Sequence, residues 1–323
     1  MKLKLTATLI IAICSFSNVY SWGFYAHRLI NRSAVYLLPP EMMMLYKSQI
    51  DFIEEHAVDP DKRRYAIKEE APRHFIDLDN YGHFPFDSLP KSYNDALEKY
   101  GEAHVHDNGI VPWWVQTMYG RLVQAFKNKD QIRILKLSTE LGHYLGDMHV
   151  PLHATSNYNG QQTNQHGIHG FWESRLPELF AEKEYDFIIG KAEYITNRKA
   201  FIWTKVFESA RAADTVLSFE AKLNEEFPAD QKYSFEERSG KIIKQYSTAY
   251  SRAYQNMMLG MVERRMRQSI YATASFWYSA WVDAGQPDLT TLTNKELSEA
   301  DKKEIEEMNT IWKNSSNMIG RQE

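Results

Sequence analysis

Histidines and carboxylates stand four residues apart at two places in this chain. His143 and Asp147 occur in "HYLGDMHVPLH", and His169 and Glu173 occur in "HGFWE". On a helix, side chains at this spacing project from the same face, so each pair can reach one metal ion. The proline in the first segment ends its helix, and the resulting turn can bring His153 close to a neighbouring position. A single pair is more often a surface hydrogen bond or a cap, but two pairs and a further histidine favour a metal site. Nitrogen and oxygen ligands without sulfur indicate zinc or another first-row ion.

The N-terminal segment is typical of a cleavable secretory signal. It has a basic start, an apolar run and small residues shortly before Trp22. We therefore expect residues 1–21 to be a signal peptide, and the mature chain to begin at Trp22 and to be exported, either to the periplasm or out of the cell. A retained anchor is less favoured, because the apolar run is shorter than the roughly 20 residues of a spanning helix. The only cysteine, Cys14, lies in this segment. An exported chain without thiols must be held by a large core, by bound metal, or by both.

Composition permits the large core and limits the partners. The chain has 323 residues, of which 43% are hydrophobic and 13% aromatic, and its formal net charge is −4. These values are typical of a globular protein. They exclude a bulk basic field that would attract nucleic acid or an anionic membrane, so any recognition of an anion must be local. The sequence contains no Gly-rich phosphate loop, HExxH pair or serine nucleophile elbow.

The elements that would position these side chains are helices. Apolar residues recur at spacings of three and four, which predicts amphipathic helices, and we find no strand pair. The fold class expected is therefore all-α, with a single multi-helix domain. Two stretches, Asp77–Val111 and Thr155–Gly170, lack this period and are expected to be long loops. A charged helix with no chemistry is expected in the tail from about residue 290. The helical segments are Tyr25–Leu38, Pro40–Ala57, Val111–Lys127, Gln131–Met148, Phe201–Phe227 and Lys241–Ala284.

The segment "HYLGDMHVPLHA" resembles the signature of the superfamily of zinc-dependent phospholipases C and single-strand-specific nucleases. Members of that superfamily are all-helical secreted phosphodiesterases with a trinuclear zinc cluster. Their mature chains begin with a tryptophan, whose α-amino nitrogen and carbonyl oxygen bind one zinc together with a histidine shortly after it. Trp22 and His27 match these two positions. The resemblance thus implies a phosphodiesterase domain over residues 22–323, three zinc ions, and a phospholipid head group or single-stranded nucleic acid as substrate. It implies no stable membrane anchor, and no protein partner is inferred.

The remaining ligands follow from the resemblance one position at a time. It assigns the first zinc to Asp59, His74 and His143, and it makes Asp147 the bridge to the zinc of Trp22 and His27. It assigns the third zinc to His153, His169 and Glu173. Asp61 competes with Asp59, but we prefer Asp59 because it stands fifteen residues before His74 and follows Ala-Val. As in the phospholipases of the superfamily, Asp59 would also orient or deprotonate the attacking water, which makes it the expected catalytic residue.

Features of the sequence divide between the two branches of the superfamily, which differ in substrate. Glu173, the absence of disulfides and the near-neutral charge favour the phospholipase C branch, whereas His149 favours the nuclease branch. We expect a phosphodiesterase of phospholipase C type, with a single-strand-specific nuclease as the alternative. A non-catalytic, metal-stabilised binding protein is the second alternative. We expect His149 to be structural, and the role of His166 stays open.

Overall fold

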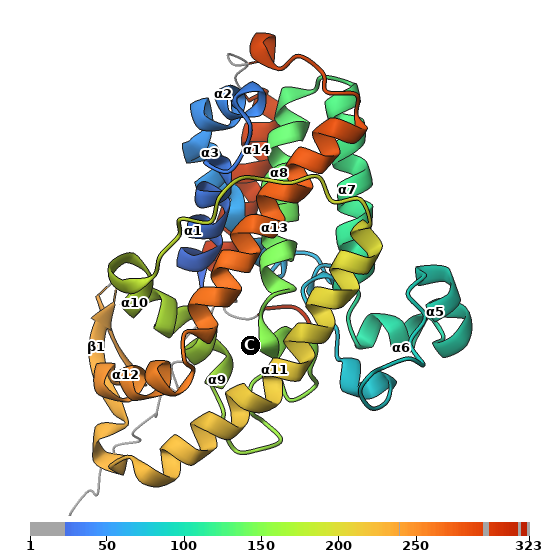
Figure 1. The fold of residues 1–323 in the computed structure, drawn as a ribbon. Coiled ribbons are helices and arrows are strands. Elements are labelled where there is room, and N and C mark those ends of the chain that lie inside the picture. The colour runs from blue at the N-terminus through green and yellow to red at the C-terminus, as the bar shows by residue number, and fades with distance from the viewer. Residues whose placement is uncertain (1–22, 239, 293–296, 316–317, 322–323) are drawn as a thin grey trace, which may run out of the picture.

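A computed structural model describes residues 23–238, 240–292, 297–315 and 318–321, and its architecture is mainly helical (Figure 1). The signal peptide predicted for residues 1–21 lies outside the described residues. The four longest helices are α7 (Val111–Lys127), α8 (Gln131–Asp147), α11 (Arg198–Glu226) and α13 (Met261–Asp283). The expected all-α fold class is confirmed. The shorter helices are α1 (Phe24–Val35), α2 (Pro40–Ser48), α3 (Ile50–Glu55), α4 (Asp59–Arg63), α5 (Tyr93–Tyr100), α6 (Glu102–Asp107), α9 (Ile168–Gly170), α10 (Leu176–Glu184), α12 (Thr248–Met257) and α14 (Glu299–Asn314).

Helix α8 lies in the middle of the bundle, where it packs against α1, α7 and α13 (Figure 1). Its apolar face is buried, and two aromatic side chains that pack against it have their polar atoms paired. The Trp277 indole N–H donates to the carbonyl oxygen of Ser138 over 2.8 Å, and the hydroxyls of Tyr46 and Ser138 lie 2.8 Å apart. Buried Trp and Tyr side chains need such partners, because an unpaired polar group inside a core is costly. These contacts hold α8 in place and thereby fix the position of its last turn.

Two glycines on one face of α8 let α1 approach closely. A Cβ atom at Gly142 would lie 2.0 Å from the side-chain oxygen of Asn31, and one at Gly146 would lie 3.2 Å from the ring of His27. The Asn31 amide donates to the carbonyl oxygen of Thr139 over 2.9 Å, which fixes the two helices relative to each other. Because α1 and α8 approach so closely, His27 of α1 lies against the last turn of α8, which carries His143 and Asp147.

The helix predicted over Lys241–Ala284 is wrong in its first part. The chain forms an antiparallel hairpin of β1 (Tyr233–Arg238) and β2 (Lys241–Tyr246), in which Tyr233 pairs with Tyr246. The tyrosines at 246, 250 and 254 are four residues apart, and this helical spacing extends the pattern into a strand. A second interruption separates α12 from α13 at Leu259 and Gly260, which both have positive φ. The hairpin is the one sheet within the described residues.

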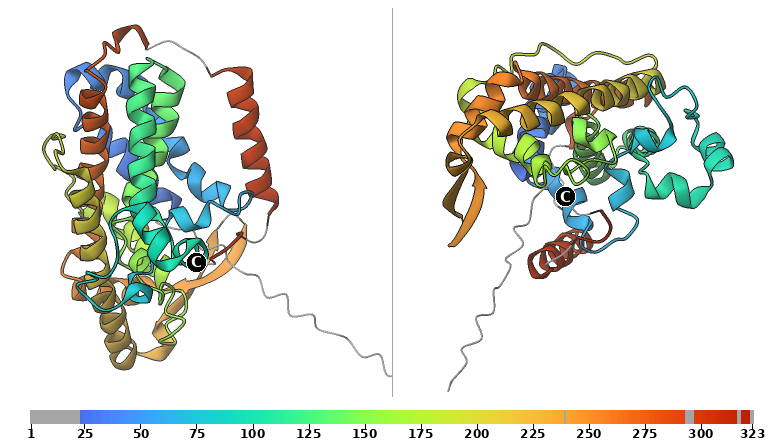
Figure 2. Two further views of the ribbon diagram at one scale, coloured as in Figure 1. Left: turned by 90° about the vertical axis from the view of Figure 1, so that its right-hand side faces the viewer. Right: turned by 90° about the horizontal axis from the view of Figure 1, so that it is seen from below.

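The two expected loops and the charged tail are each partly structured. The stretch from Asp77 to Val111 contains α5 and α6, whereas Thr155–Gly170 is irregular until α9 begins. The charged tail forms α14, which lies outside the bundle (Figure 2) and has no buried residue. Lys136 of α8 pairs with Asp301 and Glu304 of this helix over 3.2 and 2.9 Å. Among the described residues, no helix is long and apolar enough to cross a membrane.

Candidate metal centre

Asp147, on the last turn of α8, faces histidines with both of its carboxylate oxygens. Oδ2 lies 3.3 Å from Nε2 of His143, one turn earlier, and 2.9 Å from Nδ1 of His74. Oδ1 lies 3.3 Å from Nε2 of His27 on α1. All four side chains are fully buried or nearly so. A carboxylate that faces different imidazoles with its two oxygens has the arrangement of a bridge between two cations.

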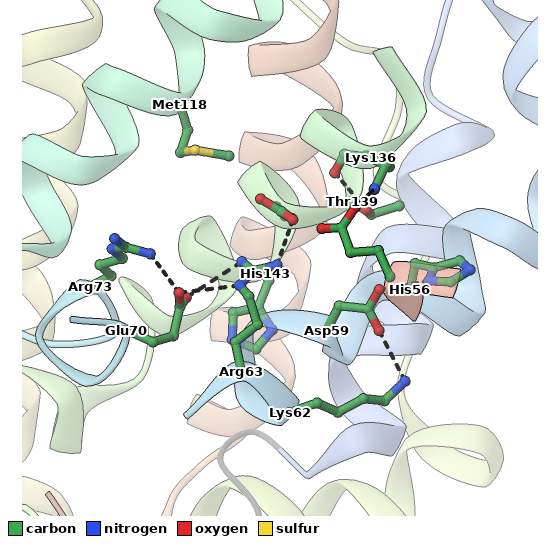
Figure 3. Close-up of polar contacts among 12 residues, drawn as sticks. His56, Asp59, Lys62, Arg63, Glu70, Arg73, Met118, Lys136, Thr139 and His143 are labelled. Carbon is green, nitrogen blue, oxygen red and sulfur yellow. Dashed lines mark hydrogen bonds and ion pairs between the residues drawn. The ribbon is translucent and has the colours of Figure 1, made fainter. Parts of the chain in front are cut away.

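The carboxylate that lies with this group in the structure is Asp61, whereas the expected ligand Asp59 lies outside it. Asp61 Oδ1 lies 3.5 Å from His143 Nε2 and 3.7 Å from His74 Nδ1. Asp59 instead bonds to His56 Nδ1 over 2.6 Å and to Lys62 Nζ over 2.9 Å, as Figure 3 shows. Asp59 and Asp61 lie in one helical turn, where residues two positions apart point in different directions. The turn of α4 therefore aims Asp61 inward and leaves Asp59 against Lys62.

A second group lies around His153, His169 and Glu173. The 3₁₀ turn η4 (Pro151–Ala154) carries His153, α9 carries His169, and a π-helical turn at Phe171–Arg175 carries Glu173. Glu173 Oε2 lies 3.4 Å from His153 Nε2 and 3.1 Å from His169 Nε2, and these two nitrogens are 3.1 Å apart. Isolated π-helical turns occur often at functional sites. The three side chains are buried and could hold one ion.

Hydrogen bonds to backbone carbonyls fix the orientation of three of these rings. Nδ1 of His143 lies 2.9 Å from the carbonyl oxygen of Ala57, and Nδ1 of His153 lies 2.7 Å from that of His74. Nδ1 of His169 lies 3.2 Å from the carbonyl oxygen of Tyr158. A carbonyl can only accept, so each Nδ1 carries the proton and each Nε2 keeps a lone pair. Metal-binding histidines are held in this way.

Unpaired buried atoms show that these residues fit a cation. Both ring nitrogens of His27, both oxygens of Asp61 and of Glu173, and Oδ1 of Asp147 are buried without a hydrogen-bond partner within the described part of the chain. Leaving such groups unpaired costs about 1–3 kcal/mol each, and more when they are charged. Divalent cations would satisfy them together, and the mixture of imidazole and carboxylate suits zinc.

The pKa values of His143, Asp61 and Asp147 also fit a site that binds cations. Burial, together with the nearby charge of His27, lowers the pKa of His143 to about 3, so its imidazole is neutral at pH 7. Burial also raises the pKa of Asp61 to about 7, and the negative charge of Asp147 adds to this shift. The pKa of Asp147 is held well below its usual range, because His143 and His153 outweigh the effect of burial. A bound cation would favour the ionised form of Asp61.

An ion-pair network behind His74 was not anticipated from the sequence. Glu70 accepts hydrogen bonds from Arg73 over 2.6 Å and from Arg63 over 3.2 Å (Figure 3). It also accepts one from the hydroxyl of Tyr144, and its Oε1 lies 3.5 Å from His74 Nε2. Burial acts to raise the pKa of Glu70, but the charge of Arg63 prevails and holds it far below its usual range. Arg73 and His74 follow Glu70 by three and four residues, whereas Arg63 and Tyr144 lie on other elements, where no local spacing identifies them. The network contacts Nε2 of His74, whereas Asp147 contacts Nδ1, so the ring is held from both sides.

The remaining candidates fall outside these groups. Trp22 lies outside the described residues, but the backbone N–H of Gly23, its neighbour, donates to the hydroxyl of Ser174 over 3.1 Å. Ser174 directly follows Glu173, so the first described residue lies beside the metal-binding groups. His149 is buried, with Nδ1 2.7 Å from the carbonyl oxygen of Leu145, and burial beside Arg265 lowers its pKa to about 3. His149 belongs to neither of these two groups of candidate ligands.

The comparisons with known proteins agree with this site. The sequence model of the S1/P1 nuclease family matches residues 22–276, which is more than half of the chain. The chain belongs to the S1/P1 nuclease family. S1/P1 nucleases are zinc-dependent phosphodiesterases, so this protein is a zinc-dependent hydrolase of phosphodiester bonds. The resemblance noted from the sequence is confirmed, and the match favours the nuclease alternative over the phospholipase C expectation. A search among curated proteins gave no match.

Proposed function

We propose that the protein is an exported nuclease that cleaves phosphodiester bonds of single-stranded nucleic acid. The observation that carries this proposal is the family match across the segments that hold all the candidate ligands. The near-neutral charge does not oppose it, because a nuclease that works through a metal cluster and base stacking needs few basic residues. Features that favoured a phospholipase, such as Glu173, have no support from the comparisons.

The proposal includes three zinc ions, held by ligands in three sets. Asp147 would serve two of the sets, since its oxygens face different histidines. The first set is Asp61, His74 and His143 with Asp147, the second is Trp22 and His27 with Asp147, and the third is His153, His169 and Glu173.

The charge of such a site would attract the substrate. Three zinc ions bring six positive charges, and three carboxylates, Asp61, Asp147 and Glu173, bring three negative ones. The difference leaves a site of about +3, which favours the anionic phosphodiester. Local charge can therefore replace the bulk basic field that the chain lacks.

The chemistry divides between the ions and the chain. When bound, zinc supplies Lewis acidity, which makes a water molecule acidic near pH 7 and stabilises negative charge on phosphate oxygens. Asp61 has two buried oxygens with no hydrogen-bond partner among the described residues, so one of them can accept the proton of the attacking water. Hydrolysis forms one phosphorus–oxygen bond from that water and breaks the bond to the leaving sugar oxygen, which takes up a proton. The hydrogen bonds from Nδ1 to the carbonyl oxygens keep the histidine rings in place throughout.

An experiment in which the metal is removed and then returned distinguishes a nuclease from a non-catalytic binding protein that zinc only stabilises. The mature protein is treated with a chelator, dialysed and reloaded with zinc, and each form is assayed on a single-stranded oligonucleotide and on bis-p-nitrophenyl phosphate. We expect both activities to disappear with the metal and to return on reloading. Fully loaded, folded protein that hydrolyses neither compound above buffer would overturn the enzymatic function.

A further inference from the structure

The segment Met318–Arg321 returns from α14 to the edge of the metal-binding groups. The backbone N–H of Ile319 donates to the carbonyl oxygen of Arg64 over 2.8 Å, and the guanidinium of Arg64 donates to the carbonyl oxygen of Arg321 over 2.7 Å. Arg64 follows Asp61 by three residues. The segment is therefore fastened beside the turn that carries a candidate ligand.

The side chain of Arg321 lies between two aromatic rings. Its guanidinium carbon is 4.0 Å from the ring centre of Phe75 and 3.6 Å from that of Tyr158. Only 7% of the side chain is exposed. This geometry is that of a flat group stacked in a narrow slot, because a guanidinium is planar and stacks on aromatic faces.

The partners that the structure gives the side chain of Arg321 at the edge of the slot are all hydrogen-bond acceptors. Arg321 Nη1 donates to Asp77 Oδ1 over 2.7 Å, and Nη2 donates to the carbonyl oxygens of Leu152 and Thr155 over 3.2 and 3.3 Å. A carboxylate and two carbonyls between aromatic walls suit a flat group that carries N–H donors. Among the parts of a nucleic acid, the bases have this shape and these donors.

The slot adjoins the candidate ligands on three sides. Phe75 follows His74, and Leu152 precedes His153. The carbonyl oxygen of Tyr158 accepts from His169 Nδ1. A base in this slot would therefore hold its phosphodiester next to the metal-binding groups.

We propose that Arg321 is a specificity-determining residue that occupies this slot in cis and competes with a base of the substrate. The proposal rests on the proposed nuclease function for the identity of the competing group. Aromatic side chains stack bases and guanidinium groups alike, so one can replace the other. Displacement requires the hydrogen bonds of this segment to break and α14 to move with it, and α14 has no buried residue that would hold it in place. Substrates without a suitable flat group fail to displace Arg321 and are held less well.

The test is the affinity for deoxyadenosine, which has the flat group and no phosphate to bind a metal. Titration calorimetry compares the protein with Arg321→Ala and with the control Arg252→Ala. Arg252 also pairs with a carboxylate, Glu184, and lies over a ring, Phe180, but on α12. If the slot is open about a tenth of the time, Arg321→Ala should tighten binding about tenfold, with no change in the control. The KM for single-stranded DNA should fall by a similar factor.

A structural role for Arg321 gives a different result. If the segment only clamps the ligand loops, Arg321→Ala lowers the zinc content and the melting temperature, and the affinity for deoxyadenosine stays the same or weakens. That outcome overturns the proposal. Arg321→Lys keeps the charge but loses the planar fork, and it should tighten binding by a smaller factor. Tighter deoxyadenosine binding by the variants without any cleavage of DNA would overturn the nuclease function and leave the slot proposal standing.

Discussion

Asp61 Oδ1 lies 3.5 Å from His143 Nε2, although the sequence favoured Asp59, which stands fifteen residues before His74. The two acidic residues of "DPD" provide a matched pair of variants. Asp61→Asn should lower zinc affinity and kcat by about a hundredfold or more, because a ligand charge is lost in a buried site. Asp59→Asn removes the negative charge that pairs with Lys62 and should leave the zinc content unchanged. Elemental analysis and kinetics on both variants decide the assignment. A greater loss of zinc and of kcat in Asp59→Asn would indicate that Asp59, and not Asp61, is the ligand.

The bridging position of Asp147 predicts how many ions each ligand controls. Asp147→Asn should lose more than one zinc equivalent, because its two oxygens face separate histidines. Glu173→Gln should lose only one equivalent, since among the described candidate ligands Glu173 contacts His153 and His169. Metal-to-protein ratios measured after dialysis test this. Equal losses of a single equivalent in the two variants would contradict the bridge.

The predicted role of Trp22 depends on a free α-amino group. Zinc binds an amine only in its neutral form, and the unperturbed pKa of about 7.7–8.0 allows this near neutral pH. A protein with one additional methionine before Trp22 should therefore lack one zinc equivalent and most of its activity. Mass spectrometry must show that the added residue is intact. Full activity with three zinc ions in that protein would sink the prediction.

Glu70 is expected to support both folding and metal binding. Glu70→Gln leaves the buried guanidinium of Arg63 with a weaker partner, at a cost of about 3 kcal/mol of unfolding free energy. The variant should also bind zinc about 10–100-fold more weakly, because His74 loses its brace. Glu140 also pairs with Arg63, but it does not contact His74, so Glu140→Gln serves as the control. Denaturant unfolding and zinc titration check the two effects, and equal zinc affinity in both variants would refute the brace.

Gly146 should be intolerant of even one methyl group. A Cβ atom there would lie 3.2 Å from the His27 ring, so Gly146→Ala requires that ring to shift by a few tenths of an ångström. We expect about a tenfold fall in activity and a loss of zinc. A Cβ atom at Gly120 on α7 would meet no described atom within 4 Å apart from the chain next to it in its own helix. Gly120→Ala should therefore stabilise the protein by about 0.5–1 kcal/mol. A fully active, zinc-replete Gly146→Ala protein would contradict the close approach of α1 and α8.

Local spacing was sufficient to identify the ligands that share an element. His143 with Asp147 and His169 with Glu173 are each four residues apart, and the structure places the members of each pair 3.3 and 3.1 Å from each other. The choice between Asp59 and Asp61 could not be made this way. Both lie in one short helical turn, and only its packing against α8 determines which carboxylate points inward.

Contacts between distant segments explain the remaining differences. Glu70 approaches Tyr144 and Arg63 from a separate turn, and Arg321 reaches Phe75 from the other end of the chain. Neither relation leaves a periodic pattern. The hairpin was missed for a related reason, since Tyr246 continues a helical spacing that its strand does not obey. The helical core, by contrast, depends on an apolar period that the sequence carries throughout.

The most direct test of the nuclease function is kcat/KM measured with the zinc-loaded mature protein on three substrates at one salt concentration. These are a single-stranded oligodeoxynucleotide, the same sequence as a duplex, and phosphatidylcholine. We expect efficient cleavage of the single strand, weaker cleavage of the duplex and no release of phosphocholine. Release of phosphocholine without cleavage of the single strand would contradict that function.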